Sequence, residues 1–336
     1  MNIRNRLSLA TIILFMAILA VNNLLPQKDY PANKSGPEIN FVVENGEFGS
    51  AIATKLVTSG VIKSADVFIE EFISNPKAQG ISAGVHRIES KVPATVAIEQ
   101  LLDPKRLVNQ VIIREGTNLG DVIKVLKKSE NIDAEEFSRE SLQLVSPLFP
   151  ELSKSLEGSL YPAHYSFAPG TSLISALEQM VAKAKSVASF TGLDIGFEDY
   201  NAYEVLTIAS MVQVEGDPTN FEKVARVIYN RLKIGMPLQL NATVQYASNK
   251  RGEILVTNED TKIISPYNTY RVVGLPPTPI SNPGSAAISA SLKPASGSWI
   301  YFITVAPGDT RFTSDFEEFS GWNMEFNRNV AAGVFK

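Results

Sequence analysis

The chain of 336 residues contains no cysteine and only two histidines, His86 and His164. Without cysteine the protein can form no disulfide, carry out no thiol catalysis and bind no zinc through thiolates. The two histidines are too few and too far apart in sequence to suggest a histidine metal site, and we interpret both as surface or satisfied residues. We therefore predict no metal site.

Charge is also sparse, and it is nearly balanced. Charged residues make up 20% of the chain and the net charge is −4, which argues against a nucleic-acid partner. Hydrophobic residues make up 44%, as in ordinary globular proteins, and the length allows two or three domains with their own cores. The composition therefore indicates a globular protein with no nucleic-acid-binding role.

One long apolar run is present near the start of the sequence. LSLATIILFMAILAV, residues 7–21, follows Arg4 and Arg6, and no further charge occurs before Lys28. The run is short for a membrane span of ~20 residues, but it comes close to that length when residues up to 25 are added. A cleaved signal peptide is the competing interpretation, although VNNLLPQKDY lacks a clean A-x-A cleavage site.

We predict that this run is a single transmembrane anchor. Residues 1–6 would form a cytoplasmic tail, residues 7–25 the anchor, and PQKDYPANKSGPE, residues 26–38, a linker. The positive-inside rule then places the rest of the chain outside the cytoplasm. We therefore predict a single-pass protein of the bacterial inner cell membrane with extracytoplasmic domains. ATP, NAD and similar cytosolic cofactors are not expected there, and we predict no cofactor.

A repeat follows the linker. FVVENGEFGSAIATKLVTSGVI, residues 41–62, and VIIREGTNLGDVIKVLKKSENI, residues 111–132, superpose at a constant offset of 70. In each copy an apolar run leads to a glycine, Gly46 or Gly116, and then to apolar residues at helical spacing. This pattern predicts a strand, a tight turn and an amphipathic helix, and it resembles LysM-like modules, which bind glycan chains. We expect residues 39–155 to form such an α+β module, with spacing and scaffolding as adequate alternative roles.

Residues 156–336 predict a second α+β domain. FEDYNAYEVLTIASMVQVEG, 197–216, and DPTNFEKVARVIYNRLKIG, 217–235, have the terminal signals and apolar periodicity of helices. YNTYRVVGLPPTPISNPG, 267–284, has too many prolines and glycines for a regular element. SWIYFITVAPGDTRFTSD, 298–315, predicts a strand pair around a Pro–Gly turn. The expected fold class is therefore α+β in both domains.

Glu215 is the candidate catalytic residue, because it stands at the end of an apolar helix. In IASMVQVEGDP it lies on the same helical face as Ile208, Met211 and Val212. Apolar surroundings and the negative end of the helix dipole both disfavour a charged carboxylate, so its pKa should be raised. A carboxylic acid that stays protonated near neutral pH is what a general acid needs to cleave a glycosidic bond. A solvated, idle glutamate at a frayed helix end is the alternative.

A second catalytic carboxylate is not evident. Retaining and inverting hydrolases normally need two carboxylates. However, Asp217 is better explained as a helix N-cap, and the sequence cannot show whether Glu157 comes close. A lytic transglycosylase needs only one acid, which protonates the leaving oxygen and then removes a proton from the sugar's own 6-hydroxyl. A lone suitable glutamate therefore fits this chemistry best.

The motifs from residue 156 onwards resemble those of a known family. LEGSLYP, IASMVQVEGD, YNRLKIGMPLQ, SPYNTY, GLPPTPISNPG, the KPA segment, YFITV and RFTS follow one another as in the MltG (YceG-like) family of endolytic murein transglycosylases. The order of anchor, LysM-like module and catalytic domain is also similar, so the resemblance covers almost the whole chain. The YNTY…GLPPxPIxNPG block is highly specific and ASxVxxE is moderately so.

The resemblance implies roles for individual residues. It makes Glu215 the catalytic acid. The residues that it implies bind substrate or shape its groove are Asn230, Arg231, Gln239, Tyr267, Asn268, Thr269, Tyr270, Leu275, Pro276 and Asn282. Because Arg231 lies near the apolar stripe of its helix, an equally good interpretation makes it a buried structural partner for a carboxylate.

The sequence also departs from the family pattern. Many members have glutamate where Gln213 stands, and Asn241 and Ala242 replace an Asp–Pro pair. Arg311 and Phe319 stand where the family has histidines. These changes leave the acid and the central loop intact, and they bear on one edge of the site.

The sequence thus predicts a membrane-anchored, endolytic lytic transglycosylase. It would cleave the MurNAc–GlcNAc bond of nascent peptidoglycan strands and leave 1,6-anhydro-MurNAc ends, with Glu215 as general acid and base. The expected partners are the glycan strands, the membrane and cell-wall synthases such as penicillin-binding proteins. The alternative is a non-catalytic peptidoglycan-binding scaffold for those synthases, which would use the repeats 41–62 and 111–132.

Overall fold

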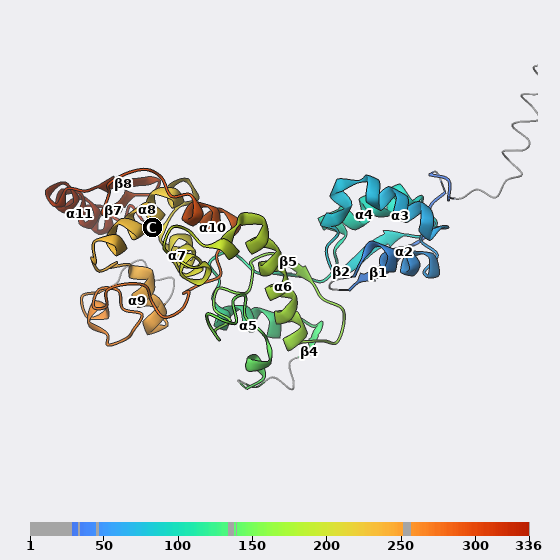
Figure 1. Cartoon of the computed structure of the whole chain (residues 1–336), viewed down its shortest axis with the longest axis horizontal. Helices are drawn as coiled ribbons and strands as arrows, with labels where there is room; N and C mark the ends of the chain where they lie inside the picture. Colours follow the sequence, from blue (N-terminus) through green and yellow to red (C-terminus); the bar gives the residue numbers. More distant parts are fainter. Residues whose placement is uncertain are drawn as a thin grey trace, which may run out of the picture. The chain divides into compact units, whose positions relative to one another are not determined.

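A computed structural model of the chain describes residues 29–335, except 33, 45–46, 134–137, 139 and 251–256 (Figure 1). The predicted anchor, residues 7–25, lies outside these residues. Within the described part of the chain, no helix has both the length and the apolar character that a membrane crossing requires. The described elements combine helices with short strand pairs, which confirms the predicted α+β class.

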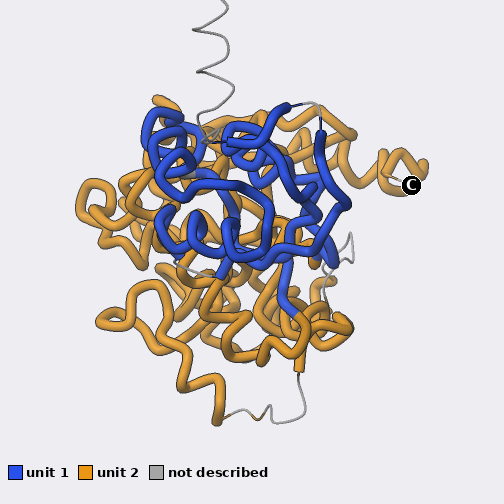
Figure 2. The backbone as a smooth tube through the Cα atoms, turned by 90° about the vertical axis from the view of Figure 1, so that its right-hand side faces the viewer, with its two compact units in different colours: residues 1–110, 166–168 blue, residues 111–165, 169–336 orange. Residues whose placement is uncertain are grey.

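The chain forms two compact units, which Figure 2 colours separately. The first comprises residues up to Gln110 together with Ser166–Ala168, and the second comprises Val111–Tyr165 and the residues from Pro169 onwards. The predicted module, residues 39–155, is therefore divided between the two units, because its second repeat copy belongs to the second unit. The likeness of this module to LysM stays a prediction.

The first unit is a two-stranded antiparallel sheet packed against helices. Strand β1 (Glu38–Val43) pairs with β2 (Gly84–Glu89), so that Phe41 lies opposite His86. Its α-helices are α2 (Gly49–Thr58), α3 (Ala65–Ser74) and α4 (Ala94–Leu102). Apolar side chains from the sheet and from all three helices meet in one core, among them Phe41, Leu56, Phe68 and Ile98.

The second unit contains most of the helices. They are α5 (Leu119–Lys127), α6 (Leu173–Thr191), α7 (Ala202–Glu215), α8 (Phe221–Lys233), α9 (Asn241–Ser248), α10 (Ser285–Leu292) and α11 (Phe316–Ala331). Its strands include the parallel pair β4 (Ile132–Asp133) and β6 (Thr171–Ser172) and the antiparallel hairpin β7 (Tyr301–Ala306) and β8 (Asp309–Thr313). The hairpin turns at Gly308, as predicted from the sequence.

Three further features complete the element order. Strand β3 (Gln110–Ile112) pairs with β5 (His164–Ser166). Short 3-10 helices occupy Pro76–Gly80, Pro104–Arg106, Ser141–Leu144, Leu193–Ile195, Pro218–Asn220 and Asp260–Lys262. The Pro-rich segment 267–284 forms no helix or strand, as expected, so its shape depends on side-chain contacts.

Both repeat copies form the predicted strand and helix. β1 and α2 in the first copy correspond to β3 and α5 in the second. Gly116 has a φ of +78°, which L side chains rarely adopt, and so it makes the tight turn expected of it. Gly46 lies outside the described residues. Helix α5 is held in the second unit by Glu157, whose Oε1 accepts a hydrogen bond from the backbone N–H of Leu119 at 2.9 Å.

Helix α7 runs through the core of the second unit. Every residue from Val205 to Val212 is buried, and α8 and α10 pack against the helix. It begins with a capping box, in which Asn201 accepts a hydrogen bond from the backbone N–H of Glu204 and the Glu204 carboxylate accepts one from that of Asn201. It ends at Glu215. Local sequence therefore places this carboxyl group at the end of a buried helix.

Candidate active site

A cavity of about 460 Å³ lies at the end of α7 in the second unit. Glu215 lines it, together with Arg231 of α8, Gln239, Asn241 of α9 and Tyr270. Its volume falls within the range of about 300–1,000 Å³ that is usual for small-molecule sites. Of the described residues that line it, Glu215 is the only acid and Arg231 the only base.

Burial controls the protonation of Glu215. It raises the pKa of this carboxyl group to about 7. Two weaker effects lower the pKa: the N–H of Ala242 donates a hydrogen bond to Oε1 at 2.7 Å, and the positive charge of Arg231 attracts the carboxylate. Burial prevails because the loss of water around a carboxylate disfavours its charged form more than these two contacts favour it. The raised pKa confirms the prediction made from the apolar helix face.

Arg231 is buried, and backbone oxygens hold its guanidinium group. Nε donates to the oxygen of Ile300 at 2.6 Å and Nη1 donates to that of Leu238 at 2.5 Å. The guanidinium carbon also lies 5.6 Å from the ring centre of Tyr301, within range of a cation–π interaction. Arg231 lines the cavity, and it is also a buried residue whose charge stabilises the Glu215 carboxylate. Its contact with substrate stays a prediction.

Tyr270 and Asn241 form a polar pair in the cavity. The Tyr270 hydroxyl donates a hydrogen bond to Oδ1 of Asn241 at 2.6 Å. Burial, followed by the negative charge of Glu215, raises the pKa of Tyr270 to about 12, so the phenol stays protonated. The first turn of α9 therefore makes two contacts in the cavity: the side chain of Asn241 bonds Tyr270, and the backbone N–H of Ala242 bonds Glu215. These two departures from the family pattern lie directly at the acid.

Thr269 and Asn268 are buried and hold the irregular loop in place. The backbone oxygen of Thr269 accepts from the N–H of Gln239 at 3.0 Å, and its hydroxyl oxygen accepts from that of Leu240, also at 3.0 Å. These bonds secure Gln239 at a φ of +50°, in the left-handed region. Asn268 donates through Nδ2 to two backbone oxygens, at 2.9 and 2.8 Å. Neither Thr269 nor Asn268 lines the cavity.

Asn282 joins segments that are far apart in the sequence. Its Oδ1 accepts from the N–H of Leu160 at 2.8 Å, and its Nδ2 donates to the oxygen of Thr117 at 2.8 Å. The side chain is fully buried. Asn230 similarly donates to two backbone oxygens, at 3.1 and 2.9 Å. Both amides therefore fix the backbone of neighbouring segments.

Tyr267, Leu275 and Pro276 belong to the packing of the loop. The ring of Tyr267 packs against that of Tyr246 on α9, with 4.9 Å between ring centres, and its hydroxyl group hydrogen-bonds that of Thr278 at 2.9 Å. Leu275 packs against the core between α7 and α8, and Pro276 is buried.

Of the residues predicted to bind substrate, the cavity includes Arg231, Gln239 and Tyr270. The others lie elsewhere in the second unit, and they are Asn230, Tyr267, Asn268, Thr269, Leu275, Pro276 and Asn282. In this structure the polar side chains among them hydrogen-bond the protein itself, whereas Leu275 packs against the core and Pro276 is buried. Their contact with substrate stays a prediction.

Gln213 and Arg311, two further departures from the family pattern, connect neighbouring elements. Oε1 of Gln213 accepts from the N–H of Gly284, just before α10, at 2.8 Å. Arg311 of β8 forms ion pairs with Asp309 at 2.6 Å and with Glu325 of α11 at 2.9 Å. Neither Gln213 nor Arg311 lines the cavity, so these departures do not alter its surface.

The two carboxylates considered as partners of Glu215 have other roles. Asp217 accepts from the N–H of Thr219 at 3.0 Å and so caps the 3-10 helix Pro218–Asn220. It was predicted to cap the long helix that follows, but α8 begins only at Phe221, with Asn220 at its N-cap position. Glu157 is buried and binds the first residue of α5 and the hydroxyl of Tyr246, which donates to Oε2 at 3.0 Å. Neither carboxylate lines the cavity. Within the described ranges, no group of three or more histidine or acidic residues is placed to hold a metal ion.

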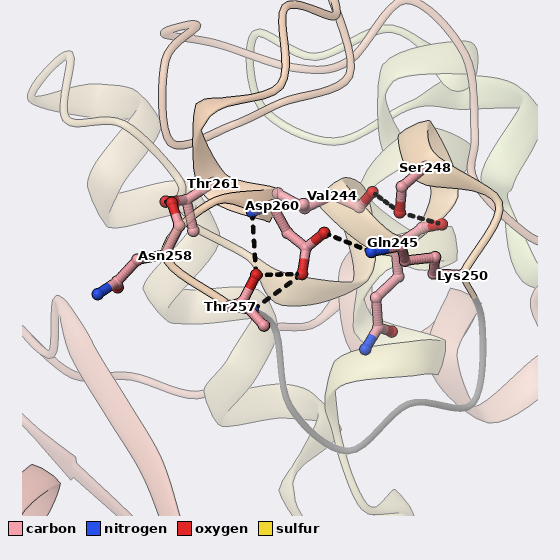
Figure 3. Close-up of polar contacts among 8 residues, drawn as sticks. All are labelled: Val244, Gln245, Ser248, Lys250, Thr257, Asn258, Asp260 and Thr261. Carbon is pink, nitrogen blue, oxygen red and sulfur yellow. Dashed lines mark hydrogen bonds and ion pairs between the residues drawn. The ribbon is translucent and has the colours of Figure 1, made fainter.

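A polar network around Asp260 secures the far end of α9 (Figure 3). Its carboxylate accepts from the hydroxyl and the N–H of Thr257 at 2.7 and 3.0 Å, and from Nζ of Lys250 at 2.9 Å. The bonds from Thr257 and Lys250 lower the pKa of Asp260 to about 2, so it is charged at neutral pH. The network braces the helix whose first turn contacts Glu215.

Sequence reasoning missed a second part of the cavity surface. It consists of Phe302, Ile303 and Thr304 from β7, and of Phe319, Asn323, Phe326 and Phe335 on or after α11. Helix α11 was not predicted, and Phe319 was considered only as a replacement for histidine. The spacing of Phe319, Asn323 and Phe326 places them on one helical face, and this signal would have found the helix.

Comparisons with known proteins agree with this arrangement. The sequence model of the YceG-like family matches residues 41–323. The endolytic murein transglycosylase of Bacillus subtilis (strain 168) is 30% identical over 302 residues, covering 83% of this chain and 82% of that protein. A namesake from Streptococcus pneumoniae is 28% identical over 325 residues, and the match covers 87% of this chain but only 58% of the relative. A crystal structure of a yceG-like protein from Listeria monocytogenes superposes with a TM-score of 0.55 at 25% identity, covering 85% of this chain and 99% of that one.

Proposed function

Since the chain belongs to the YceG-like family, we propose that it is a lytic transglycosylase that cuts peptidoglycan strands internally. The names of the relatives from Bacillus subtilis and Streptococcus pneumoniae support this activity. The bond cut is the one between MurNAc and GlcNAc, and the new end is a 1,6-anhydro-MurNAc. Glu215 acts as both general acid and general base.

The proposed reaction needs one carboxyl group and no water. Protonated Glu215 gives its proton to the glycosidic oxygen, and the bond from that oxygen to C1 of MurNAc breaks. The resulting carboxylate then removes the proton from the 6-hydroxyl of the same sugar, and the freed oxygen forms a bond to C1, which closes the anhydro ring. Glu215 is protonated again at the end. A pKa of about 7 suits both halves of this cycle, because neither protonation state is strongly disfavoured at neutral pH.

The surroundings of Glu215 support both steps. Its burial favours the protonated form that starts the reaction. The Ala242 N–H and the charge of Arg231 favour the carboxylate that forms halfway through. Tyr270 remains a neutral phenol and can donate or accept hydrogen bonds beside the acid.

The observation that carries the proposal is the solitary, protonatable carboxyl group in a ligand-sized cavity. Glu215 is the only acid among the described residues that line it. A two-carboxylate hydrolase mechanism lacks its second group there, since Glu157 and Asp217 are engaged elsewhere.

Purified peptide-free glycan strands provide the test. Wild-type protein should release fragments whose summed mass equals that of the uncut strand, because no water is added. Glu215→Gln should lower kcat by at least about 10³-fold, since the amide cannot transfer a proton. Glu222→Gln is the matched control, because Glu222 is an exposed acid on the adjacent helix α8. Fragments that each gain one water would indicate hydrolysis, and strands left intact by wild-type protein would favour a non-catalytic wall-binding scaffold.

We also propose that residues 7–25 anchor the protein in the inner cell membrane, with the rest of the chain outside the cytoplasm near cell-wall synthases. The apolar run and the preceding arginines, Arg4 and Arg6, motivate this topology. Without protease, the protein should be found in the membrane fraction of spheroplasts. Protease added outside intact spheroplasts should then digest the two described units. Full protection of these units in intact spheroplasts would contradict the proposed orientation.

A further inference from the structure

We propose that the cavity contains an aromatic sugar-binding subsite built by β7, α11 and the residue Phe335. We define the aromatic wall as Phe302, Phe319, Phe326 and Phe335, all of which line the same cavity as Glu215. Its ligand is the uncharged GlcNAc ring next to the bond that Glu215 cuts. This inference rests on the proposed function, and it names the sugar ring of the substrate that the aromatic wall contacts.

The four rings are partly exposed to the cavity although they are large and apolar. Each is supported by another ring. Phe319 stacks on Tyr301 with 4.9 Å between ring centres, and Phe302 stacks on Phe312 at 5.8 Å. Phe326 and Phe335 support each other in an edge-to-face pair at 5.4 Å. Supported rings that remain partly exposed in a cavity offer apolar faces to a ligand.

The distribution of charge selects the kind of ligand. Glu215 and Arg231 are the charged groups among the described lining residues, and the aromatic wall contains none. A phosphate or a peptide carboxylate placed against this wall would lose water without gaining a counter-ion, which is costly. A pyranose ring fits better, because its axial C–H groups form apolar faces while its edge carries hydroxyl and acetamido groups. Asn323 and Thr304 line the cavity beside the rings and can hydrogen-bond such an edge.

The wall is fixed to the rest of the unit before any ligand binds. Arg311 of β8 holds Glu325 of α11 at 2.9 Å, and Nδ2 of Asn329 on α11 donates to the oxygen of Val305 on β7 at 2.7 Å. These contacts attach the helix to the hairpin near the rings. A preorganised wall reduces the conformational entropy that a ligand must remove on binding.

The aromatic wall extends beyond the part of the chain that the family model matches. The matched residues of the YceG-like family end at 323, and both Phe326 and Phe335 lie beyond them. Phe302 and Phe319 lie within the matched residues.

Binding is measured with the full-length Glu215→Gln protein, so that the ligand is not consumed. The probe is a peptide-free tetrasaccharide of alternating GlcNAc and MurNAc, titrated by isothermal calorimetry. Phe326→Ala should weaken its binding by about tenfold, and Phe326→Trp should restore most of it, because an aromatic face is retained. Phe190→Ala is the matched control and should change nothing, since Phe190 is 91% exposed on α6 and does not line the cavity.

The same substitutions in the active protein separate this inference from the proposed function. Phe326→Ala should raise KM about tenfold with little change in kcat, as expected when binding shared by substrate and transition state is lost. If Phe326→Ala binds the tetrasaccharide as tightly as the parent, the subsite is refuted, even when wild-type protein cuts glycan normally. If binding depends on Phe326 but wild-type protein cuts no glycan, the subsite stands and the enzymatic proposal fails. Phe302→Ala provides a second, independent variant in case Phe326→Ala does not fold.

Discussion

Ala242→Pro tests how the first turn of α9 sets the acidity of Glu215. The backbone N–H of Ala242 donates to Oε1 of Glu215 at 2.7 Å, and proline has no N–H to replace it. The substitution should be tolerated, because Ala242 lies in the first turn of α9, where an N–H needs no partner within the helix. The family resemblance, which places an Asp–Pro pair at 241–242, also supports this tolerance.

The size of the effect follows from the hydrogen bond that is lost. A hydrogen bond to a charged group is worth ~1.5–3 kcal/mol, and a change of one pKa unit corresponds to ~1.4 kcal/mol. Because the bond favours the carboxylate, its removal should raise the pKa of Glu215 from about 7 to at least about 8. The fraction of protonated acid at pH 8 would then rise from about 9% to about 50%, a gain of about fivefold.

The assay is the pH profile of kcat/KM on peptide-free glycan strands. Activity requires the protonated acid, so it should fall as pH rises through the pKa of Glu215, with a midpoint near pH 7 in the wild type. Ala242→Pro should move this midpoint upward by about one pH unit or more. Ala242→Gly is the control, because it keeps the N–H and should leave the midpoint in place. A folded, active Ala242→Pro protein with an unchanged midpoint would refute the assignment of Glu215 as the titrating acid.

Three further predictions concern buried polar residues. Glu157→Gln should lower the unfolding midpoint in urea, because it weakens the hydrogen bonds of this side chain to α5 and Tyr246. It should leave the pH midpoint of activity unchanged, and a shift of that midpoint would mark Glu157 as a second catalytic carboxylate. Asn282→Leu should destabilise the protein by ~1–3 kcal/mol, because it leaves the buried N–H of Leu160 without a partner, while the oxygen of Thr117 keeps its bond from the backbone N–H of residue 282. An unchanged free energy of unfolding in chemical denaturation would contradict this. Burial lowers the pKa of His86 below its usual value of 6.5, so stability should be complete above about pH 6.5 and should fall by up to ~1.4 kcal/mol per pH unit below it. His86→Phe should flatten this part of the stability profile, and an equal slope in both proteins would exclude His86 as the cause.

The acid and its helix could be predicted because their determinants are local. Asn201 and Glu204 stand three residues apart, as a capping box requires, and the apolar residues up to Val212 recur at helical spacing. The direction of the pKa shift of Glu215 was also predicted, although the residues that line the cavity around it come from other segments. The turn at Gly116 was equally predictable, because its position between a strand and a helix demands a positive φ.

The roles of the polar residues in the loop could not be read in this way. An asparagine side chain can hydrogen-bond either a ligand or a backbone group, and the sequence around Asn282 and Asn268 does not distinguish the two roles. Asn282 finds its partner at Thr117, 165 residues earlier in the sequence, and that contact exists only after the second unit has folded. Its burial makes it a support for the loop, whereas Tyr270, from the same motif, lines the cavity.

By itself the sequence determined the α+β class, the helix that ends at Glu215, the hairpin around Gly308 and the family to which the motifs point. These features depend on periodicity, capping and turn chemistry among residues that are close along the chain. Only the tertiary structure decided that Ala242, 27 residues from Glu215, would donate to it, and that the phenylalanines of β7 and α11 would line the same cavity. Such contacts arise from packing between distant segments, and no local pattern of residues encodes which of those segments will meet.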